Sequence, residues 1–275
     1  GVRALSSAQE GKTEPDLLTH CLSVDLPLDK PEAHRLLDEH REEDLYKLCL
    51  IAQCNALNAS LPFLFEEISD YTELLFPDGM LVPGSIIRRM VEEIPEEDWR
   101  EIEIVGWLYQ FYISEKKDQV IGKVVRKEDI PAATQLFTPK WIVQYMVENS
   151  LGRLWLEMHP DSPLREKMRY YIQNPDDAEL RRDPLPPEQI ACMDDACGSG
   201  HILVYLFDLL GLIYEEMGYS TREIPSLILK HNLYGLDIDR RAAQLASFAL
   251  MMKARSRDRR FLERDVLPRV LEIQE

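Results

Sequence analysis

The chain of 275 residues is 45% apolar, enough for one large or two smaller globular domains, and it carries a formal net charge of −17. That charge argues against a large phosphate-binding surface, because Lys and Arg supply most of the affinity for nucleic acids. No stretch holds the roughly 18 apolar residues of a membrane span, and the N-terminal residues lack the apolar core of a secretory signal, so we expect a cytoplasmic protein.

Residues 1–130 predict a flexible lead-in followed by a mainly α-helical N-terminal domain. Residues 1–30 mix Ser, Thr, Pro, Gly and charged side chains without periodicity. Residues 34–60 and 98–117 place apolar side chains at spacings of three and four, which is the period of an amphipathic helix.

The segment that follows predicts one well-marked helix and then an irregular excursion. Thr138 is placed to cap the helix, and Pro139 fits the first helical position, where a missing N–H costs nothing. The buried face of this helix is expected to comprise Trp141, Ile142, Tyr145, Met146, Leu154, Trp155 and Met158. Residues 159–188 are polar and Pro-rich, which indicates an irregular segment.

From residue 189 onward the pattern alternates between strand and helix. Strands are predicted at 190–194, 233–239 and 266–274, with helices at 201–218, 221–232 and 239–255 between them. Gly218 is expected to end the first of these helices, and Asp239 to cap the third. Such alternation implies a parallel sheet with right-handed crossovers, so we predict an α/β region over 131–275 after the helical domain.

The five cysteines do not indicate a disulfide framework or a metal site. They are odd in number, show no C-x-x-C spacing, and two of them lie in segments predicted to be buried. This usage is typical of reduced thiols, and we expect no metal ligands among them.

The turn after the first predicted strand, DDACGSGH at 194–201, carries the most distinctive chemistry. It lacks the Gly-Lys-Ser/Thr ending of a phosphate loop and the G-x-G-x-x-G pattern of a dinucleotide site. Asp194 at the strand end would repel a pyrophosphate but would suit a cationic amine. Asp237, at the end of the second strand, is placed to accept hydrogen bonds from a ribose. An amine and a ribose without phosphate describe S-adenosylmethionine (SAM).

Both segments also have simpler structural interpretations. The turn could serve only as a tight link between strand and helix, and Asp237 and Asp239 could serve only as helix caps. Their occurrence in order on consecutive strands favours the cofactor interpretation. We expect Asp237 to lie at the exposed end of its strand with few core contacts, and Asp239 to act mainly as a cap.

DDACGSGH resembles the D-P-A-C-G-S-G cofactor motif of the class I, SAM-dependent N6-adenine DNA methyltransferases, with Asp195 in place of Pro. FTP at 137–139 resembles the family segment that touches the methionine part of the cofactor, and GLDID at 235–239 resembles its ribose-binding segment. The segments VGWLYQFYISEKK and IPAATQLFTPKW further resemble the methyltransferases of the BREX phage-defence systems.

This resemblance implies a partial Rossmann-like sheet that binds SAM. The implied cofactor residues are Phe137, Thr138, Pro139, Asp194, Ala196, Cys197, Gly198, Ser199, Gly200, His201, Asp237 and Ile238. Three of these roles stay open: Cys197 fits a small packing residue better than a nucleophile, His201 fits helix-start packing or a cofactor lid, and Ile238 fits adenine packing or core.

The resemblance also implies an enzyme that methylates N6 of adenine in double-stranded DNA, with other phage-defence subunits as further partners. The catalytic Asn/Asp-Pro-Pro-aromatic segment of that family does not occur in the sequence, so no catalytic residue is assigned. We therefore expect a piece of a longer enzyme that is inactive alone. The alternatives are a non-catalytic SAM-binding regulatory module and a methyltransferase of RNA or protein.

The basic run ARSRDRR at 254–260 stands out in an acidic chain. The simpler interpretation is a solvated helix C-terminus, where cations complement the helix dipole. The alternative is a contact with DNA.

Overall fold

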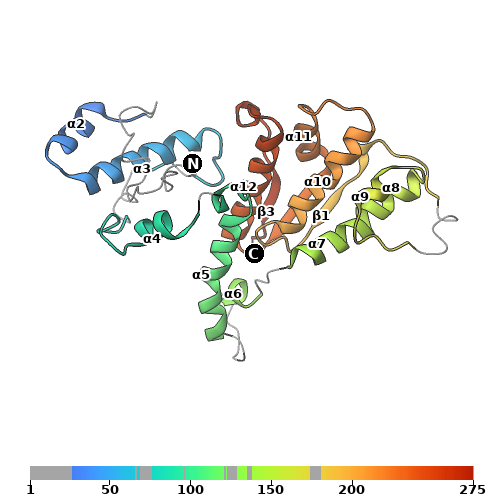
Figure 1. The fold of residues 1–275 in the computed structure, drawn as a ribbon, viewed down its shortest axis with the longest axis horizontal. Coiled ribbons are helices and arrows are strands. Elements are labelled where there is room, and N and C mark those ends of the chain that lie inside the picture. The colour runs from blue at the N-terminus through green and yellow to red at the C-terminus, as the bar shows by residue number, and fades with distance from the viewer. Residues whose placement is uncertain are drawn as a thin grey trace. The chain divides into compact units, whose positions relative to one another are not determined.

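The computed structural model describes residues 27–65, 67–68, 76–95, 97–120, 122, 129–134, 138–173 and 181–274. The chain divides into two compact units, Gly1–Ile104 and Val105–Glu275 (Figure 1). Helix α5 (Ile104–Val120), which the sequence places in the N-terminal domain, falls almost wholly in the second unit. The predicted domain boundary at residue 130 stays a prediction, and most of the predicted lead-in lies outside the described residues.

The first unit is helical in the part that the structure describes, as predicted. It contains α2 (Lys30–Asp38), α3 (Glu42–Asn58), α4 (Ile86–Glu93) and the 3-10 turn η3 (Asp98–Arg100). Helix α2 begins where the Asp29 side chain accepts a hydrogen bond from the Glu32 N–H. Buried apolar side chains of α2 and α3 form its core together with Met80 and Leu81.

The second unit begins with helices that precede the sheet. They are α5 (Ile104–Val120), α6 (Ile130–Thr134), α7 (Lys140–Val147), the π-helical turn η5 (Glu148–Gly152), α8 (Arg153–Met158), α9 (Leu164–Lys167) and the 3-10 turn η7 (Pro187–Gln189). None of the described helices, in either unit, is long and apolar enough to cross a membrane.

Two predictions for the start of this region are wrong. Pro139 is the N-cap of α7 with an extended backbone, so the helix starts at Lys140 and no side chain caps it; Thr138 is not the cap. Of the predicted buried face, Trp155 and Met158 are buried as expected. Trp141 is 55% exposed, however, and Tyr145 and Met146 are also exposed, whereas Val143 and Val147 are buried in their place. The apolar side chains of α7 itself point in nearly every direction around the helix axis. The periodicity of the sequence therefore could not determine which face of α7 is buried.

The sheet is built by strict alternation, which confirms the predicted α/β pattern. In chain order the elements are β1 (Cys192–Asp194), α10 (His201–Glu216), α11 (Ile224–Leu227), the π-helical turn η8 (Ile228–Asn232), β2 (Leu233–Asp237), α12 (Arg240–Arg257), η9 (Phe261–Glu263) and β3 (Arg269–Glu272). The strands are parallel in the order β1-β2-β3, with Asp194 opposite Gly235 and Asp237 opposite Glu272. This is compatible with part of a Rossmann-like fold.

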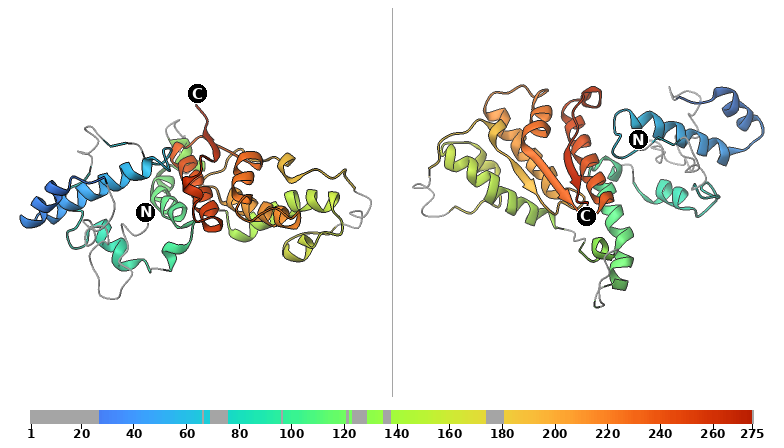
Figure 2. Two further views of the ribbon diagram at one scale, coloured as in Figure 1. Left: turned by 90° about the horizontal axis from the view of Figure 1, so that it is seen from above. Right: turned by 180° about the vertical axis from the view of Figure 1, so that it is seen from behind.

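Helices α10 and α12 pack beside each other and against the strands (Figure 2). Half of α10 or more is buried, including Phe207, Leu210 and Ile213 at 0% exposure. Gly218 follows the end of α10 with a positive φ of 82°, as the predicted C-terminal stop requires. Asp239 caps α12, since its carboxylate accepts the Arg241 N–H at 3.0 Å, which confirms that prediction.

A single buried amide ties the approaches to β1 and β2 together. Asn232 is fully buried, and its Nδ2 donates to the carbonyl oxygens of Pro187 at 2.6 Å and Ile190 at 2.7 Å. Its Oδ1 accepts the Tyr214 hydroxyl of α10 at 2.9 Å. One side chain therefore positions the start of β1, the start of β2 and the helix between them.

We predict that Asn232→Leu lowers the free energy of unfolding by at least about 2 kcal/mol. The change leaves the Ile190 carbonyl group and the Tyr214 hydroxyl without this partner, and it removes one of the two donors to the Pro187 carbonyl, which keeps the Ile190 N–H at 3.1 Å. Each buried polar group left unpaired costs about 1–3 kcal/mol. Urea unfolding followed by circular dichroism measures the effect. The neighbouring exposed His231→Leu is the control and should change little; equal losses in the two variants would contradict this role for Asn232.

Candidate cofactor-binding site

The turn after β1 is docked onto the carboxyl end of β2. The Cys197 N–H donates to the Leu236 carbonyl at 2.9 Å, and the Gly198 N–H donates to Asp237 Oδ2 at 2.7 Å. The structure thus brings the two predicted segments, 194–201 and 235–239, into direct contact at one edge of the sheet.

Asp237 is more deeply integrated than the sequence suggested. It is only 9% exposed, and its second oxygen, Oδ1, accepts the Asp239 N–H at 2.8 Å. The expectation of an exposed carboxylate with few contacts is therefore wrong. One carboxylate fixes both the glycine turn and the start of α12, because the charge-assisted bonds that it accepts come from backbone groups on either side of it.

Asp194 is the least satisfied carboxylate at this edge. Its Oδ1 accepts the Ala196 N–H at 3.3 Å, whereas its Oδ2 is buried and has no hydrogen-bond partner in the part of the chain that the structure describes. Burial raises the pKa of this carboxyl above its usual range, and the nearby charges of Asp195 and Asp237 add to the rise. A buried acceptor in this state is suited to a cationic donor.

The two glycines of the turn are required for different structural reasons. Gly200 has a φ of 90° and meets α12: an added Cβ would lie 2.9 Å from both Cα and Cβ of Ala246. Gly198 has a φ of 53°, but an added Cβ would have no heavy atom within 4 Å. Gly200 is thus needed for close helix packing, while Gly198 keeps a space open beside Asp237.

Helix α5 supports the turn through residues to which the sequence analysis assigned no role. An added Cβ on Gly106 would lie 3.0 Å from Oγ of the buried Ser199, so the helix approaches the turn closely. His201 Nε2 lies 3.3 Å from both Ser199 Oγ and Gln110 Nε2. His201 is thus held by structural neighbours, and its role as a lid stays a prediction.

A second contact from α5 reaches the cap of α12. The Tyr109 hydroxyl donates to Asp239 Oδ2, and burial together with this bond raises the pKa of Tyr109. Gly106, Tyr109 and Gln110 all lie in the stretch VGWLYQFYISEKK, whose likeness to the BREX methyltransferases was the one signal in the sequence that these residues support the site.

The remaining predicted residues differ in exposure. Cys197 is buried, and its pKa is raised to about 12 by burial and by the charges of Asp237 and Asp194, so a thiolate nucleophile is disfavoured. Ile238 is 45% exposed, and Ala196 is exposed too.

The FTP segment is only partly described. Thr138 and Pro139 lie at the start of α7, which packs on α10, and no hydrogen bond joins them to the turn within the described residues. Phe137 lies outside the described residues. Nor, among the residues described, do three or more His, Cys, Asp or Glu side chains gather as metal ligands would.

A groove of about 660 Å³ runs along β1 on the side of α7. Its walls include Tyr145 and Met146 of α7, Met193 of β1 and Ile202 of α10, and Asp194 belongs to its lining. Met193 is 60% exposed there. An apolar groove with one unsatisfied carboxylate has the size and character of a ligand pocket.

Comparison with known proteins finds relatives along the full length of the chain. The adenine-specific methyltransferase BrxX of Escherichia coli O9:H4 (strain HS) is 51% identical over 287 residues, which cover 100% of this chain and 24% of that protein. The adenine-specific methyltransferase PglX of Lacticaseibacillus casei (strain Zhang) is 40% identical over 301 residues, which cover 99% of this chain and 25% of that protein. No family model matches the chain.

The chain therefore spans about a quarter of the length of these curated relatives. The likeness to adenine methyltransferases that the sequence motifs indicated is confirmed.

We predict that Gly200→Ala destabilises the protein more than Gly198→Ala. Both alanines adopt a left-handed conformation, which costs about 1–2 kcal/mol. Only the alanine at 200 also meets the backbone of α12, and such overpacking costs a further 1–3 kcal/mol or so. Urea unfolding of the two variants measures the difference; equal losses would show that the contact with Ala246 does not limit this position.

Proposed function

The chain is homologous over its whole length to part of the adenine-specific methyltransferases, and from this premise we propose that it forms the SAM-binding portion of such an enzyme. In this proposal the sheet is the cofactor-binding half of a Rossmann-like class I methyltransferase fold, and the β1–α10 turn holds the cofactor. The whole protein would transfer a methyl group from SAM to N6 of adenine in double-stranded DNA.

The observation that carries the proposal is that Oδ2 of Asp194 is buried and has no hydrogen-bond partner among the described residues. Burying a charged oxygen without a partner costs free energy, so a protein retains one where a ligand pairs with it. The α-ammonium group of SAM is such a ligand. Asp194 also lines an apolar groove that can take the rest of the methionine chain.

The other residues of the turn fit the same ligand. The open space at Gly198 lets a ligand approach the backbone beside Asp237. Each oxygen of Asp237 accepts one backbone N–H and keeps a second lone pair, which suits the ribose hydroxyl groups. Ile238 is exposed beside them and offers an apolar surface to the adenine ring.

When bound, SAM would supply a methyl carbon on a sulfonium sulfur: the adenine amine would attack that carbon in line, the C–S bond would break, S-adenosylhomocysteine would leave, and the amine would lose one proton. The residues of this chain contribute position and electrostatics: they orient the cofactor, and they exclude water from the groove beside β1. The segment that holds the target base is not found in the 275 residues, so these residues alone are expected to bind cofactor without methylating DNA.

The biological setting follows from the same likeness. We propose double-stranded DNA as substrate, contacted mainly by parts of the protein that the chain does not include, and a role in BREX phage defence together with other subunits of that system. A DNA methyltransferase of this kind works in the bacterial cytoplasm.

We predict that Asp194→Asn in the complete protein weakens SAM binding by at least about tenfold and slows adenine methylation at limiting SAM. A charge-assisted hydrogen bond is worth about 1.5–3 kcal/mol, and about 1.4 kcal/mol is tenfold in affinity. Titration calorimetry measures the binding, and incorporation of labelled methyl groups into duplex DNA measures the activity. Asp161→Asn is the matched control, because Asp161 is an exposed carboxylate outside the lining of the groove.

The pH dependence gives a second readout of the same prediction. Because the folded pKa of Asp194 is raised, its ionisation costs stability once the pH rises through that pKa, and SAM binds only to the ionised form. SAM affinity should therefore fall as the pH drops through the raised pKa, and Asp194→Asn should abolish that fall without lowering the unfolding midpoint at neutral pH. Unchanged affinity in Asp194→Asn would refute the proposed role of this carboxylate.

A further inference from the structure

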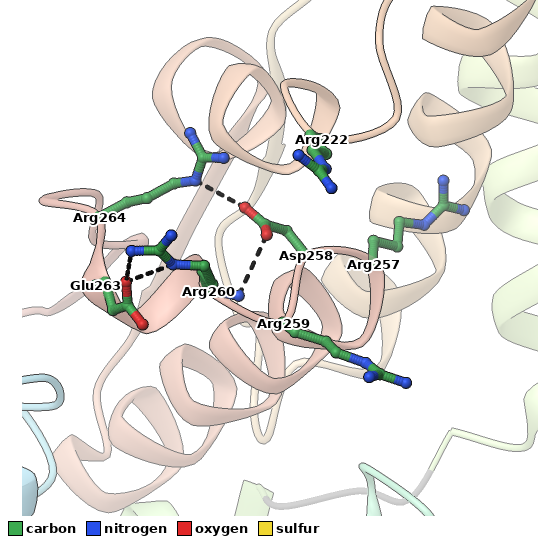
Figure 3. Close-up of a pocket in the computed structure, with 7 residues that line it drawn as sticks. All are labelled: Arg222, Arg257, Asp258, Arg259, Arg260, Glu263 and Arg264. Atoms are coloured by element: carbon green, nitrogen blue, oxygen red, sulfur yellow. Dashed lines mark hydrogen bonds and ion pairs between the residues drawn. The ribbon is translucent and has the colours of Figure 1, made fainter.

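A second pocket of about 710 Å³ is lined mainly by arginine (Figure 3). Its lining consists of Arg222, Arg257, Arg259, Arg260 and Arg264 together with Asp258 and Glu263. These residues come from the loop before α11, the end of α12 and the turn η9. Five arginines thus line one pocket together with two acidic residues, in a chain whose formal net charge is −17.

The arginine pocket lies at the opposite edge of the sheet from the cofactor-binding turn. In a parallel sheet the connecting helices run antiparallel to the strands, so the end of α12 and the loop before α11 lie at the amino ends of the strands. The turn 194–200 lies at the carboxyl ends. The two sites are therefore separate, and methyl transfer does not account for the arginines.

Three of the arginines are committed to neighbouring carboxylates. Arg264 pairs with Asp258 at 2.7 Å, and Arg260 pairs with Glu263 at 2.7 Å, as the dashed lines in Figure 3 show. Arg257 pairs with Glu215 of α10 at 2.8 Å. These ion pairs fix the side chains that line the pocket, and each of the two carboxylates in the lining is paired with an arginine.

The other two arginines are less committed, although the charge of Arg222 adds to the effect of the Arg260 N–H and Arg264 in lowering the pKa of Asp258. Arg222 and Arg259 are exposed, and neither forms an ion pair with any residue in the described ranges. The helix dipole of α12 accounts for cations in its last turn, such as Arg257. It does not account for Arg222, which a different segment brings to the same pocket.

We propose that the arginine pocket binds phosphate groups. The planar guanidinium group donates two parallel hydrogen bonds to a phosphate, which makes arginine the preferred residue for phosphate recognition. The volume of the pocket is within the range of small-ligand sites, so a compact ligand with two or more phosphates fits it. The phosphates come either from a nucleotide-like polyphosphate or from the backbone of a nucleic acid.

The test uses the complete protein and two probes, inorganic triphosphate and a short duplex DNA, at low salt. In the double variant Arg222→Ala/Arg259→Ala, we expect binding of the effective probe to weaken at least about tenfold, because each lost charge-assisted bond is worth about that factor or more. Binding of triphosphate identifies a polyphosphate ligand. Binding of duplex DNA but not of triphosphate identifies the nucleic acid backbone. In that case the slope of log affinity against log salt concentration should become less steep in the variant by the equivalent of about two phosphate contacts.

The matched control is Arg255→Ala/Lys230→Ala, which removes the same charge from exposed positions outside the pocket. Arg222→Lys/Arg259→Lys keeps the charge but loses the guanidinium forks, and it should recover only part of the affinity. Neither Arg222 nor Arg259 forms an ion pair in the described part of the chain, so the unfolding midpoint and SAM binding should stay close to their wild-type values. The proposal is overturned if the wild type binds neither probe, or if the control loses as much affinity as the pocket variant.

Discussion

The carboxylate of Asp237 is the interaction on which the arrangement of the site depends. One oxygen accepts the N–H of Gly198 in the turn after β1, and the other accepts the N–H of Asp239 at the start of α12. Strand β2, which ends at Asp237, the turn after β1 and the start of α12 therefore meet at one buried charge. Each bond to that charge is stronger than a bond between neutral groups. The turn is therefore held in place before any ligand arrives, which spares a ligand the cost of ordering it.

That arrangement explains why Asp194 differs from Asp237 although both end neighbouring strands. Asp237 is satisfied by backbone groups, whereas Asp194 has, among the described residues, one N–H, from Ala196, for its two oxygens. Asp237 therefore has a structural role, whereas Asp194 has an oxygen available for a ligand. A ligand with an ammonium group recovers the cost of burying Asp194, while Gly198 leaves the space in which such a ligand approaches.

The sequence predicted those parts of the fold and site that local signals determine. The alternation from β1 to β3, the stop at Gly218 and the cap at Asp239 follow from short-range periodicity and capping chemistry, and the structure confirms them. The buried face of α7 was predicted wrongly because tertiary packing selects among its many apolar side chains. The partners of Asp237 and the contacts from Gly106 and Tyr109 on α5 join residues far apart in sequence, which no local pattern encodes.

The central claim is that Asp194 holds the amine of the cofactor at the carboxyl edge of the sheet. A crystal structure of the complete protein with S-adenosylhomocysteine tests it most directly. Our account predicts the ligand's ammonium nitrogen within hydrogen-bonding distance of Asp194 Oδ2, with Gly198 against the ligand and Asp237 at its ribose. A ligand bound elsewhere, or an ammonium group paired with another residue while Asp194 Oδ2 stays unpartnered, would contradict it.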